Sequence, residues 1–234
     1  AAASSSTIEV PSRYDGSTIQ SESTIYGNTS SVSPKYSTKP FFCHSSIISF
    51  EIAVRFWTSF GPKNLNIVDG AQIPNLRGSF KYDDEGTPSS KTDLIREGVL
   101  VGRLHSRETA AIMKEKPTGN ARSIGYNFPP IVRMTNTLIE NGDSDLSDIF
   151  GDIKEGIYAK NWYGGMTSME MFTFSSGESY MIRNGKVEEM VRPVMLSGNV
   201  FSTLHNIDAI GKDLDMNQGG GCGKGGQMPL PVSN

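Results

Sequence analysis

A single cysteine near the end of the chain, Cys222, lies in the glycine-rich segment GGGCGKGGQMPLP, residues 219–231. Glycines flank it on both sides, so its sequence neighbours offer no side chains for a buried thiol to pack against. Burial as a small hydrophobic residue is therefore not indicated. Glycines instead allow positive φ or a close approach to another group. The residues leave four roles open: a flexible loop residue, a redox thiol, part of a phosphate-binding loop, or a metal ligand.

The phosphate-binding role fails on spacing. A Walker A motif requires a glycine, four residues, and then Gly-Lys followed by Ser or Thr. Here Gln218 occupies the place of the first glycine, and Gly225 occupies the place of the Ser or Thr. The loop, redox and metal roles remain open on this segment alone.

Polar residues in two other segments are also able to do chemistry. Asp83, Asp84 and Glu85 form an acidic cluster that can bind a hard cation or act as a general base. A solvated turn is nevertheless the more common use of such a cluster. Arg133 and Asn136 lie three residues apart in PPIVRMTNT, where they can orient a carboxylate or a peptide backbone, although a structural arginine is the more common case.

The three histidines, His44, His105 and His205, are far apart in the sequence, and none lies in an HExxH motif or a close variant. A lone histidine on a helix is more often a hydrogen-bonded structural residue than a metal ligand. Spacing alone therefore assembles no metal site. One other combination, Cys43 and His44 with Cys222, remains as an alternative site.

The overall composition excludes several classes of protein. The chain has 234 residues, of which 36% are hydrophobic, enough for a soluble globular core. Its net charge is −3 and it has no Lys/Arg-rich run, so we expect no binding to nucleic acid or to a membrane. Two cysteines make no disulfide framework, which favours a reducing, cytoplasmic setting.

No segment has the character of a membrane span or a signal peptide. The most apolar window, residues 41–60, contains His44, Glu51 and Arg55, which are costly inside a bilayer. The N-terminus lacks a basic region followed by an apolar one. The first residue is Ala instead of Met, so we expect a fragment or a processed chain.

The elements that must position these residues are expected to begin at about Phe60. Residues 1–59 are predicted to be low-complexity or disordered, because Ser and Thr dominate residues 1–38 and no sustained period of 2 or 3.6 is visible there. Residues 60–234 show glycines at turn spacing and alternating apolar residues, and they are predicted to form the folded domain.

Strands and short helices are predicted within this domain. Two hairpins are expected, around Glu97-Gly98 and around Asn184-Gly185, the latter a dipeptide that favours a type I′ turn. Residues 169–175, MEMFTFS, alternate as a half-buried strand does. Helices are expected from Asp143 or Ser144 to Gly156, from Ser106 to Lys114, and from about Asn199 to Ile210. This mixture without a βαβ rhythm indicates an α+β, sheet-rich fold.

Several motifs of the domain recur together in one known family. From Phe60 to Asn234 the chain resembles the C-terminal half of the TldD/PmbA family of peptidases, through motifs that follow one another in the family's order. They are IPNLRGSFKYDDEGTP, LIREGVLVGRLHSRETA, PTGNARS, PPIVRMTNT, SYMIRNGK, LSGNVFSTLHNIDAIGKDL and GGGCGKGGQMPLPVS. The family combines an N-terminal α/β domain with a sheet-rich C-terminal domain, and this chain resembles the latter.

The resemblance implies a zinc-dependent peptidase that accepts unfolded or flexible peptides. In TldD-like members, two histidines of an HExxxH segment and a cysteine in a late glycine-rich loop hold the zinc, and Cys222 matches that cysteine. Asp83, Asp84, Arg133 and Asn136 lie in matched motifs, which implies that they bind substrate or shape the site. The family also implies a homodimer, or a heterodimer with a related subunit.

The sequence departs from the family at one decisive place, because it contains no HExxxH. We therefore expect a partial zinc metallopeptidase that is inactive as this isolated chain, as a fragment or disrupted copy would be. The alternative is a non-catalytic chain: either a peptide-binding module that pairs with extended peptides by strand addition, or a partner subunit of a TldD-type complex.

Overall fold

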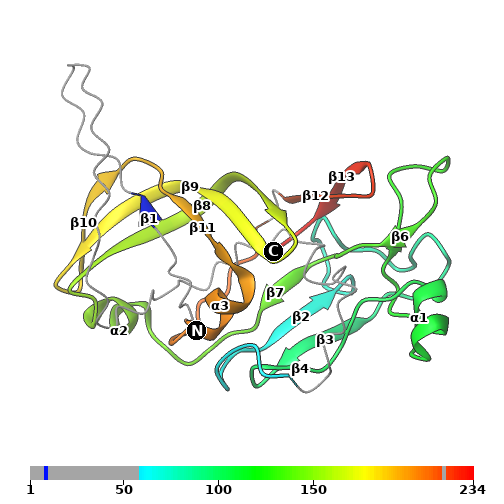
Figure 1. Ribbon diagram of the computed structural model, residues 1–234, viewed down its shortest axis with the longest axis horizontal. Coiled ribbons are helices and arrows are strands. Elements are labelled where there is room, and N and C mark those ends of the chain that lie inside the picture. Colours follow the sequence, from blue (N-terminus) through cyan, green and yellow to red (C-terminus); the bar gives the residue numbers. More distant parts are fainter. Residues whose placement is uncertain (1–7, 10–57, 218–219) are drawn as a thin grey trace, which may run out of the picture.

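The fold is rich in sheet, as the sequence predicts. The computed structural model describes residues 8–9, 58–217 and 220–234, which contain thirteen strands and three short helices. The strands form two larger antiparallel sheets and two separate two-stranded ones. Figure 1 shows the two larger sheets at opposite ends of the molecule, so that the fold is elongated.

The larger sheet is built around one long strand, β9 (Met171–Arg183). Strand β8 (Glu155–Ser168) pairs with β9 along its whole length. On the other side of β9 lie β10 (Lys186–Val191) and β11 (Met195–Asn199), and β1 (Ile8–Glu9) pairs with β11. The predicted hairpin at Asn184-Gly185 is confirmed between β9 and β10, with φ of 48° and 78° at its two turn residues.

The second sheet has the strand order β4-β3-β2-β7. Its members are β2 (Ile67–Gly70), β3 (Lys91–Arg96), β4 (Val99–Leu100) and β7 (Thr137–Ile139). The predicted hairpin at Glu97-Gly98 is confirmed between β3 and β4. A Cβ at Gly98 would lie 2.1 Å from the carbonyl oxygen of Gly61, so only glycine fits this turn.

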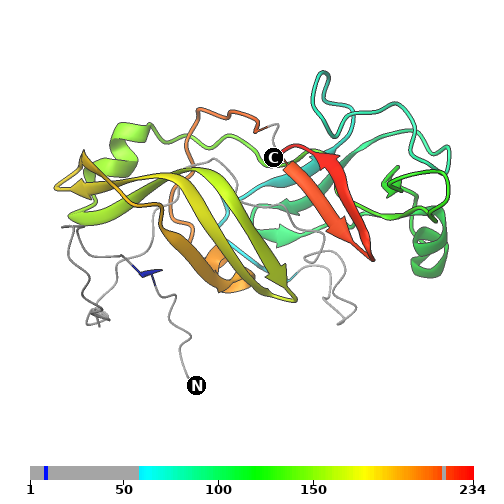
Figure 2. The ribbon, with the colours of Figure 1, turned by 90° about the horizontal axis from the view of Figure 1, so that it is seen from above.

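Two short hairpin-like pairs complete the fold. Strand β5 (Ala121–Arg122) pairs with β6 (Ile131–Val132), and β12 (Gly220–Lys224) pairs with β13 (Gln227–Val232). The glycine-rich segment around Cys222 is therefore a strand instead of a loop. Its turn consists of Gly225 and Gly226, which have φ of 58° and 74°. Figure 2 shows this red hairpin lying across the part of the molecule between the two larger sheets.

The helices are shorter than the hydrophobic pattern predicts, except the one after Ser106. Helix α1 (Arg107–Met113) has Ser106 as its N-cap, and the two residues Ser106 and Thr109 form a capping box. Helix α2 (Leu146–Gly151) ends well before the predicted Gly156, which lies in β8. Helix α3 (Val200–His205) ends before the predicted Ile210.

Competing backbone bonds explain both early ends. The carbonyl oxygen of Ile153 accepts from Gly185 N at 2.9 Å, so the chain after α2 is hydrogen-bonded to the β9–β10 turn. The carbonyl oxygen of Ile210 accepts from Ser144 N at 3.2 Å, so the chain after α3 runs beside the segment that precedes α2. A helix cannot continue where its carbonyl groups are already bonded to another segment.

The prediction for residues 1–59 concerns residues that mostly lie outside the described part. Within it the structure describes Ile8–Glu9 as a strand, together with residues 58–59. The alternative metal site of Cys43, His44 and Cys222 also lies outside the described residues, because Cys43 and His44 do. Among the described residues, no helix is long and apolar enough to cross a membrane.

Candidate functional site

Cys222 is buried, contrary to the interpretation of its glycine-rich neighbourhood. It is 1% exposed and belongs to the main hydrophobic cluster. The reason is non-local: Cys222 lies in β12 opposite Leu230 of β13, and this strand pairing places the thiol among residues far away in the sequence. Its packing partners therefore come from other elements, such as Met134 and Val232, and not from the glycines beside it.

The guanidinium of Arg133 lies against this cysteine. Its Nε donates to Cys222 Sγ at 3.4 Å, and its Nη2 donates to the carbonyl oxygens of Cys222 and Gln227, the latter at 3.2 Å. Arg133 is 0% exposed. Its Nη1 is buried and has no hydrogen-bond acceptor among the described residues. The two N–H bonds of Nη1 are thus available to a group that the described chain does not supply.

Two further cations lie close to the same hairpin. Arg122 donates to the carbonyl oxygens of Met134 and Pro231, at 2.7 and 2.8 Å, and its guanidinium stacks over the Phe80 ring at 5.1 Å. Burial lowers the pKa of Arg122 to about 10, although Asp69 and Cys222 act in the opposite direction. Sequence reasoning missed this residue as part of the site, although it lies in the quoted motif PTGNARS.

Lys224 is the third cation, on the same strand as Cys222. Its Nζ donates to the carbonyl oxygen of Val132 at 2.9 Å. Burial lowers its pKa, and attraction to Cys222 opposes this shift. With Lys224, three positively charged side chains lie on or against the hairpin that carries Cys222.

Gln227 fastens the hairpin to the segment between β5 and β6. Its Oε1 accepts from Ile124 N at 3.1 Å, and its Nε2 donates to the carbonyl oxygen of Pro129 at 2.9 Å. The motif CGKGGQ is far along the sequence from the neighbouring motifs PTGNARS and PPIVRMTNT, and these bonds join it to Pro129 and to Ile124, the residue that follows PTGNARS. The structure therefore shows why these motifs occur together.

Asp83 and Asp84 hold the strand that carries Arg122. Asp83 accepts from the N–H groups of Glu85 and Thr87 at 3.0 and 2.8 Å, and from Ala121 N at 3.0 Å. Asp84 Oδ2 accepts from the N–H and the hydroxyl of Ser123, at 2.6 and 3.0 Å. Asp83 thus accepts hydrogen bonds at both of its carboxylate oxygens, and Asp84 accepts them at one, Oδ2.

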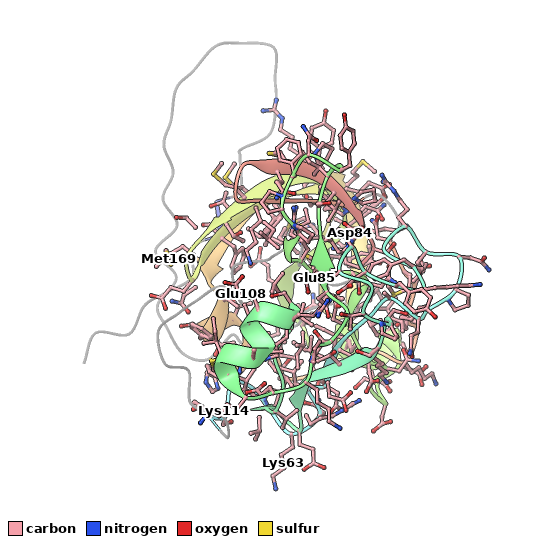
Figure 3. The ribbon with its side chains drawn as sticks, turned by 90° about the vertical axis from the view of Figure 1, so that its right-hand side faces the viewer. Lys63, Asp84, Glu85, Glu108, Lys114 and Met169 are labelled. Carbon is pink, nitrogen blue, oxygen red and sulfur yellow. The ribbon has the colours of Figure 1, made fainter. Side chains whose placement is uncertain are left out.

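The acidic cluster is thus not simply a solvated turn, since Asp83 is only 6% exposed. Asp84 is exposed, and Glu85 Oε2 accepts from Arg107 N at 2.7 Å, at the start of α1. In Figure 3, Asp84 and Glu85 lie close together above α1, whose first and last turns are marked by Glu108 and Lys114. The cluster connects α1 and β5 through backbone N–H groups.

Asn136 fixes the loop that follows β2. Its Nδ2 donates to the carbonyl oxygen of Gly70 at 2.8 Å and to Ser79 Oγ at 3.1 Å, and its Oδ1 accepts from Gly78 N at 3.1 Å. Gly78 is obligatory here, because a Cβ would lie 2.5 Å from Asn136 Oδ1 and 2.4 Å from Thr135 O. Of the four residues expected to shape the site, only Arg133 has a hydrogen bond to Cys222.

Asp69 is a buried carboxylate that the sequence reasoning missed, and its hydrogen bonds connect β2 to the segments before and after Arg133. It is 1% exposed and accepts four hydrogen bonds, from Thr135 N, Thr135 Oγ1, Thr137 Oγ1 and Asn120 Nδ2, at 2.6–2.9 Å. Asn120 in turn donates to the carbonyl oxygen of Arg133 at 3.1 Å. One signal could have indicated it: an Asp directly after the buried run Ile67-Val68 needs partners inside the protein.

Neither of the two described histidines lies with Cys222 in a group of possible metal ligands. The ring of His105 contacts Glu115 through Nε2 at 2.8 Å and Thr109 through Nδ1 at 3.1 Å, and His205 is exposed at the end of α3. Within residues 58–217 and 220–234, no three His, Cys, Asp or Glu residues gather as a metal site would require. The thiol of Cys222 suits one ligand position of a zinc ion, and among the described residues it belongs to no group of three possible ligands.

Comparison with known proteins gives a consistent result. Residues 54–228 match the family model described as the PmbA/TldA metallopeptidase C-terminal domain. A metalloprotease of Synechocystis sp. is 60% identical over 173 residues, 74% of this chain and 37% of its own length. A protein of Saccharolobus solfataricus named zinc metalloprotease TldD homolog is 38% identical over 176 residues, 74% of this chain and 39% of its own length.

Solved structures agree on the fold. TldE from Thermococcus kodakarensis has a TM-score of 0.61 at 22% identity, over 78% of this chain and 39% of its own. The chain spans less than two-fifths of the length of the Synechocystis and Saccharolobus relatives. The extent of the family match, and the identity with these metalloproteases, decide the assignment: the chain belongs to the TldD/PmbA family of metallopeptidases, with the C-terminal domain at residues 54–228.

Proposed function

We propose that this chain carries the C-terminal part of a zinc-dependent metallopeptidase and that Cys222 is one of the zinc ligands. The observation that carries the proposal is the buried thiol of Cys222 with Arg133 Nε donating to its sulfur. The name of the Saccharolobus relative supports zinc as the metal. Cysteine sulfur is a ligand that zinc favours, and zinc when bound supplies a polarised water and a Lewis acid for peptide hydrolysis.

The chain's own residues have a definite task in this proposal. The β12–β13 hairpin presents the sulfur, and its bonds to Arg122, to Arg133 and, through Gln227, to Ile124 hold it in one position. No three His, Cys, Asp or Glu residues of the described part gather as a metal site would require, so Cys222 is the one ligand that we assign.

We further infer that the isolated 234-residue chain does not hydrolyse peptides. The sequence contains no HExxxH and thus neither the two histidines nor the glutamate that the family uses. Unfolded or flexible peptides as substrates, a dimer with a like or related subunit, and a cytoplasmic location are proposals that rest on the family alone.

Cobalt substitution tests the ligand role. Titration of the purified chain with Co²⁺ is expected to give an ultraviolet thiolate-to-cobalt charge-transfer band that Cys222→Ser abolishes. Cys43→Ser is the matched control, and it is expected to keep the band. A band that survives Cys222→Ser, or one that Cys43→Ser removes, would contradict the assignment and favour the site that includes Cys43 and His44.

A peptidase assay completes the test. The Zn²⁺-treated chain, incubated with an unfolded fluorogenic peptide, is expected to release no more product than a buffer control. Chelator-sensitive release of product that Cys222→Ser abolishes would show that the isolated chain is an active peptidase and would refute the inactivity that we infer.

The second candidate function, a peptide-binding module, has one structural observation in its favour. Strand β8 is 14 residues long, and in the described part it pairs with β9 along one edge only. An open edge of this length can accept an extended peptide through backbone hydrogen bonds. Fluorescence anisotropy with a labelled unfolded peptide in the presence of EDTA separates the two functions, because strand addition needs no metal.

A further inference from the structure

Three positively charged side chains lie on or against the β12–β13 hairpin, and they come from separate segments of the chain. Arg122 is in β5, Arg133 follows β6, and Lys224 is in β12. The charge of Arg133 repels the charges of Arg122 and Lys224. Arg133 is 0% exposed, Arg122 is 8% exposed and Lys224 is half-buried, so water screens this repulsion poorly.

None of these cations is hydrogen-bonded to a carboxylate among the described residues. Arg122 and Lys224 donate to backbone carbonyl oxygens, and Arg133 donates to two carbonyl oxygens and one sulfur. Asp69 and Asp84 attract Arg122, but their own hydrogen bonds go to other residues. A buried charge without a partner of opposite charge is costly, so the positive charge at this hairpin is not fully balanced.

Two of the cations also have N–H groups to spare. Nε and Nη2 of Arg133 contact the hairpin, whereas Nη1 is buried and has no acceptor in the described part of the chain. Lys224 Nζ donates to the carbonyl oxygen of Val132, in the peptide bond that joins Val132 to Arg133, so the ammonium lies beside the backbone of Arg133. An ammonium has three N–H bonds, and this is its one described acceptor. Neighbouring groups of the fold thus keep donors for a further acceptor.

A carboxylate has the properties that such an acceptor requires. Its oxygens accept hydrogen bonds from guanidinium and ammonium groups, and these charge-assisted bonds are stronger than bonds between neutral groups. Its negative charge also offsets the repulsion among the three cations, which a water molecule would not do. Its planar shape matches that of a guanidinium.

We propose that Arg133 and Lys224 bind a carboxylate group of a peptide, through Arg133 Nη1 and Lys224 Nζ. The half-buried Lys224 forms the outer end of this site, and the fully buried Arg133 forms its inner end. The peptide as the source of the carboxylate rests on the proposed function. The carboxylate site itself requires neither a metal nor an ionised thiol at Cys222.

The first test compares three peptides of one unfolded sequence, each labelled with an uncharged dye, by fluorescence anisotropy with the 234-residue chain in EDTA. One peptide has a free C-terminal carboxylate and no acidic residue, one is amidated and neutral, and one is amidated and contains a single Glu. At least one of the two peptides that carry a carboxylate is expected to bind about 10-fold more tightly than the neutral peptide. The tighter of the two identifies the source of the carboxylate.

The second test replaces the two cations. Lys224→Met keeps the apolar stem without the charge, and Arg133→Lys removes Nη1. Each is expected to reduce the preference for a carboxylate to less than about 3-fold, while the affinity for the neutral peptide stays the same. Lys186→Met, at an exposed lysine in β10, is the matched control and is expected to keep the full preference. Near-ultraviolet circular dichroism checks that each variant is folded.

A preference in the unsubstituted chain that the folded variants lose supports the proposal. Equal affinity of the three peptides for the unsubstituted chain overturns it without any variant, and so does absence of binding by all three. A preference that either folded variant retains also overturns it, because the carboxylate then binds elsewhere. A failure of the zinc proposal appears instead in the cobalt titration, since EDTA excludes metal here, and the two failures are therefore distinguishable.

Discussion

Asp69 and Arg133 are both buried and charged, but they differ in how completely their side chains are hydrogen-bonded. The carboxylate of Asp69 accepts four hydrogen bonds from three residues of its own fold. The guanidinium of Arg133 keeps one nitrogen, Nη1, without an acceptor in the described part of the chain. Because native structures leave few buried polar groups unpaired, the complete set indicates a structural role and the incomplete set a binding one.

Replacement of Asp69 tests its structural role. Asp69→Ala leaves the donors of Thr135, Thr137 and Asn120 buried without an acceptor, so we expect a loss of about 3 kcal/mol or more in the free energy of unfolding. Asp69→Asn keeps one acceptor oxygen and is expected to lose less. Urea unfolding of the purified chain measures both variants.

Asp208→Asn provides the control for this comparison, because Asp208 is exposed and its substitution is expected to change stability by less than about 0.5 kcal/mol. An Asp69→Ala variant as stable as the control would show that the four bonds contribute nothing net to folding.

At the scale of elements, the features that depend on a few neighbouring residues could be predicted from the sequence. Asn184-Gly185 is a dipeptide that a tight hairpin turn favours, and Gly98 supplies a glycine at the second turn position of the other hairpin, so both hairpins were identified correctly. Ser106 offers a side-chain acceptor to Thr109 N, so the start of α1 was also correct. In each case the residues that predict the feature and the residues that form it are neighbours in the sequence.

The features that depend on distant partners could not be predicted. The ends of α2 and α3 are set by backbone bonds to residues 185 and 144. The glycine-rich segment becomes a strand because β13 pairs with it. The site shows the same division. Cys222 and Arg133 were selected from the sequence on residue type and motif. The contact between them, and the roles of Asp69 and Arg122, could be seen only in the tertiary structure.

An ion-pair cluster across the smaller sheet makes a prediction about pH. Glu140 follows β7 and pairs with two residues of β3, with Lys91 at 2.7 Å and with Arg96, so that it connects the strands on either side of β2. The hydrogen bond from Arg96, helped by Lys91, lowers the pKa of Glu140 below its ordinary value. The folded state therefore binds a proton here less readily than the unfolded state.

The sign of the effect follows from this lowered pKa. The stabilisation by Glu140 is fully present above about pH 4.5 and is lost as the pH falls through the lower pKa of the folded state. We expect Glu140→Gln to cost about 1 kcal/mol at pH 7, because the pair is partly exposed, and to cost little once the carboxyl is protonated. Urea unfolding at a series of pH values measures this difference.

Glu155→Gln is the control for this series. Glu155 is exposed at the start of β8, and its replacement is not expected to change how the free energy of unfolding depends on pH. An equal cost of Glu140→Gln at neutral and at acid pH would mean that packing, and not charge, accounts for the contribution of Glu140.

At the scale of the whole molecule, α3 joins the two larger sheets. The last residue of β11, Asn199, is the N-cap of α3, so the helix continues directly from the larger sheet. Val200 and Leu204 of α3 are each 1% exposed in the hydrophobic cluster that contains Ile67 and Ile95 of the smaller sheet. Figure 1 shows α3 between the two sheets. The Cys222 hairpin belongs to this same cluster, so the site shares its core with both ends of the molecule.

This shared core predicts that the described fold unfolds as one cooperative unit. Leu204→Ala removes a fully buried side chain at the junction and is expected to lower the free energy of unfolding by about 2–5 kcal/mol.

In a Trp57→Phe background, fluorescence reports Trp162 of β8 alone, whereas far-ultraviolet circular dichroism reports all strands. We expect both signals to shift together to lower urea concentration, while Ile112→Ala, at a side chain 71% exposed, leaves them almost unchanged. If the Trp162 transition instead kept its midpoint while circular dichroism fell earlier, the larger sheet would be stable without α3, and the site would depend on the smaller sheet alone.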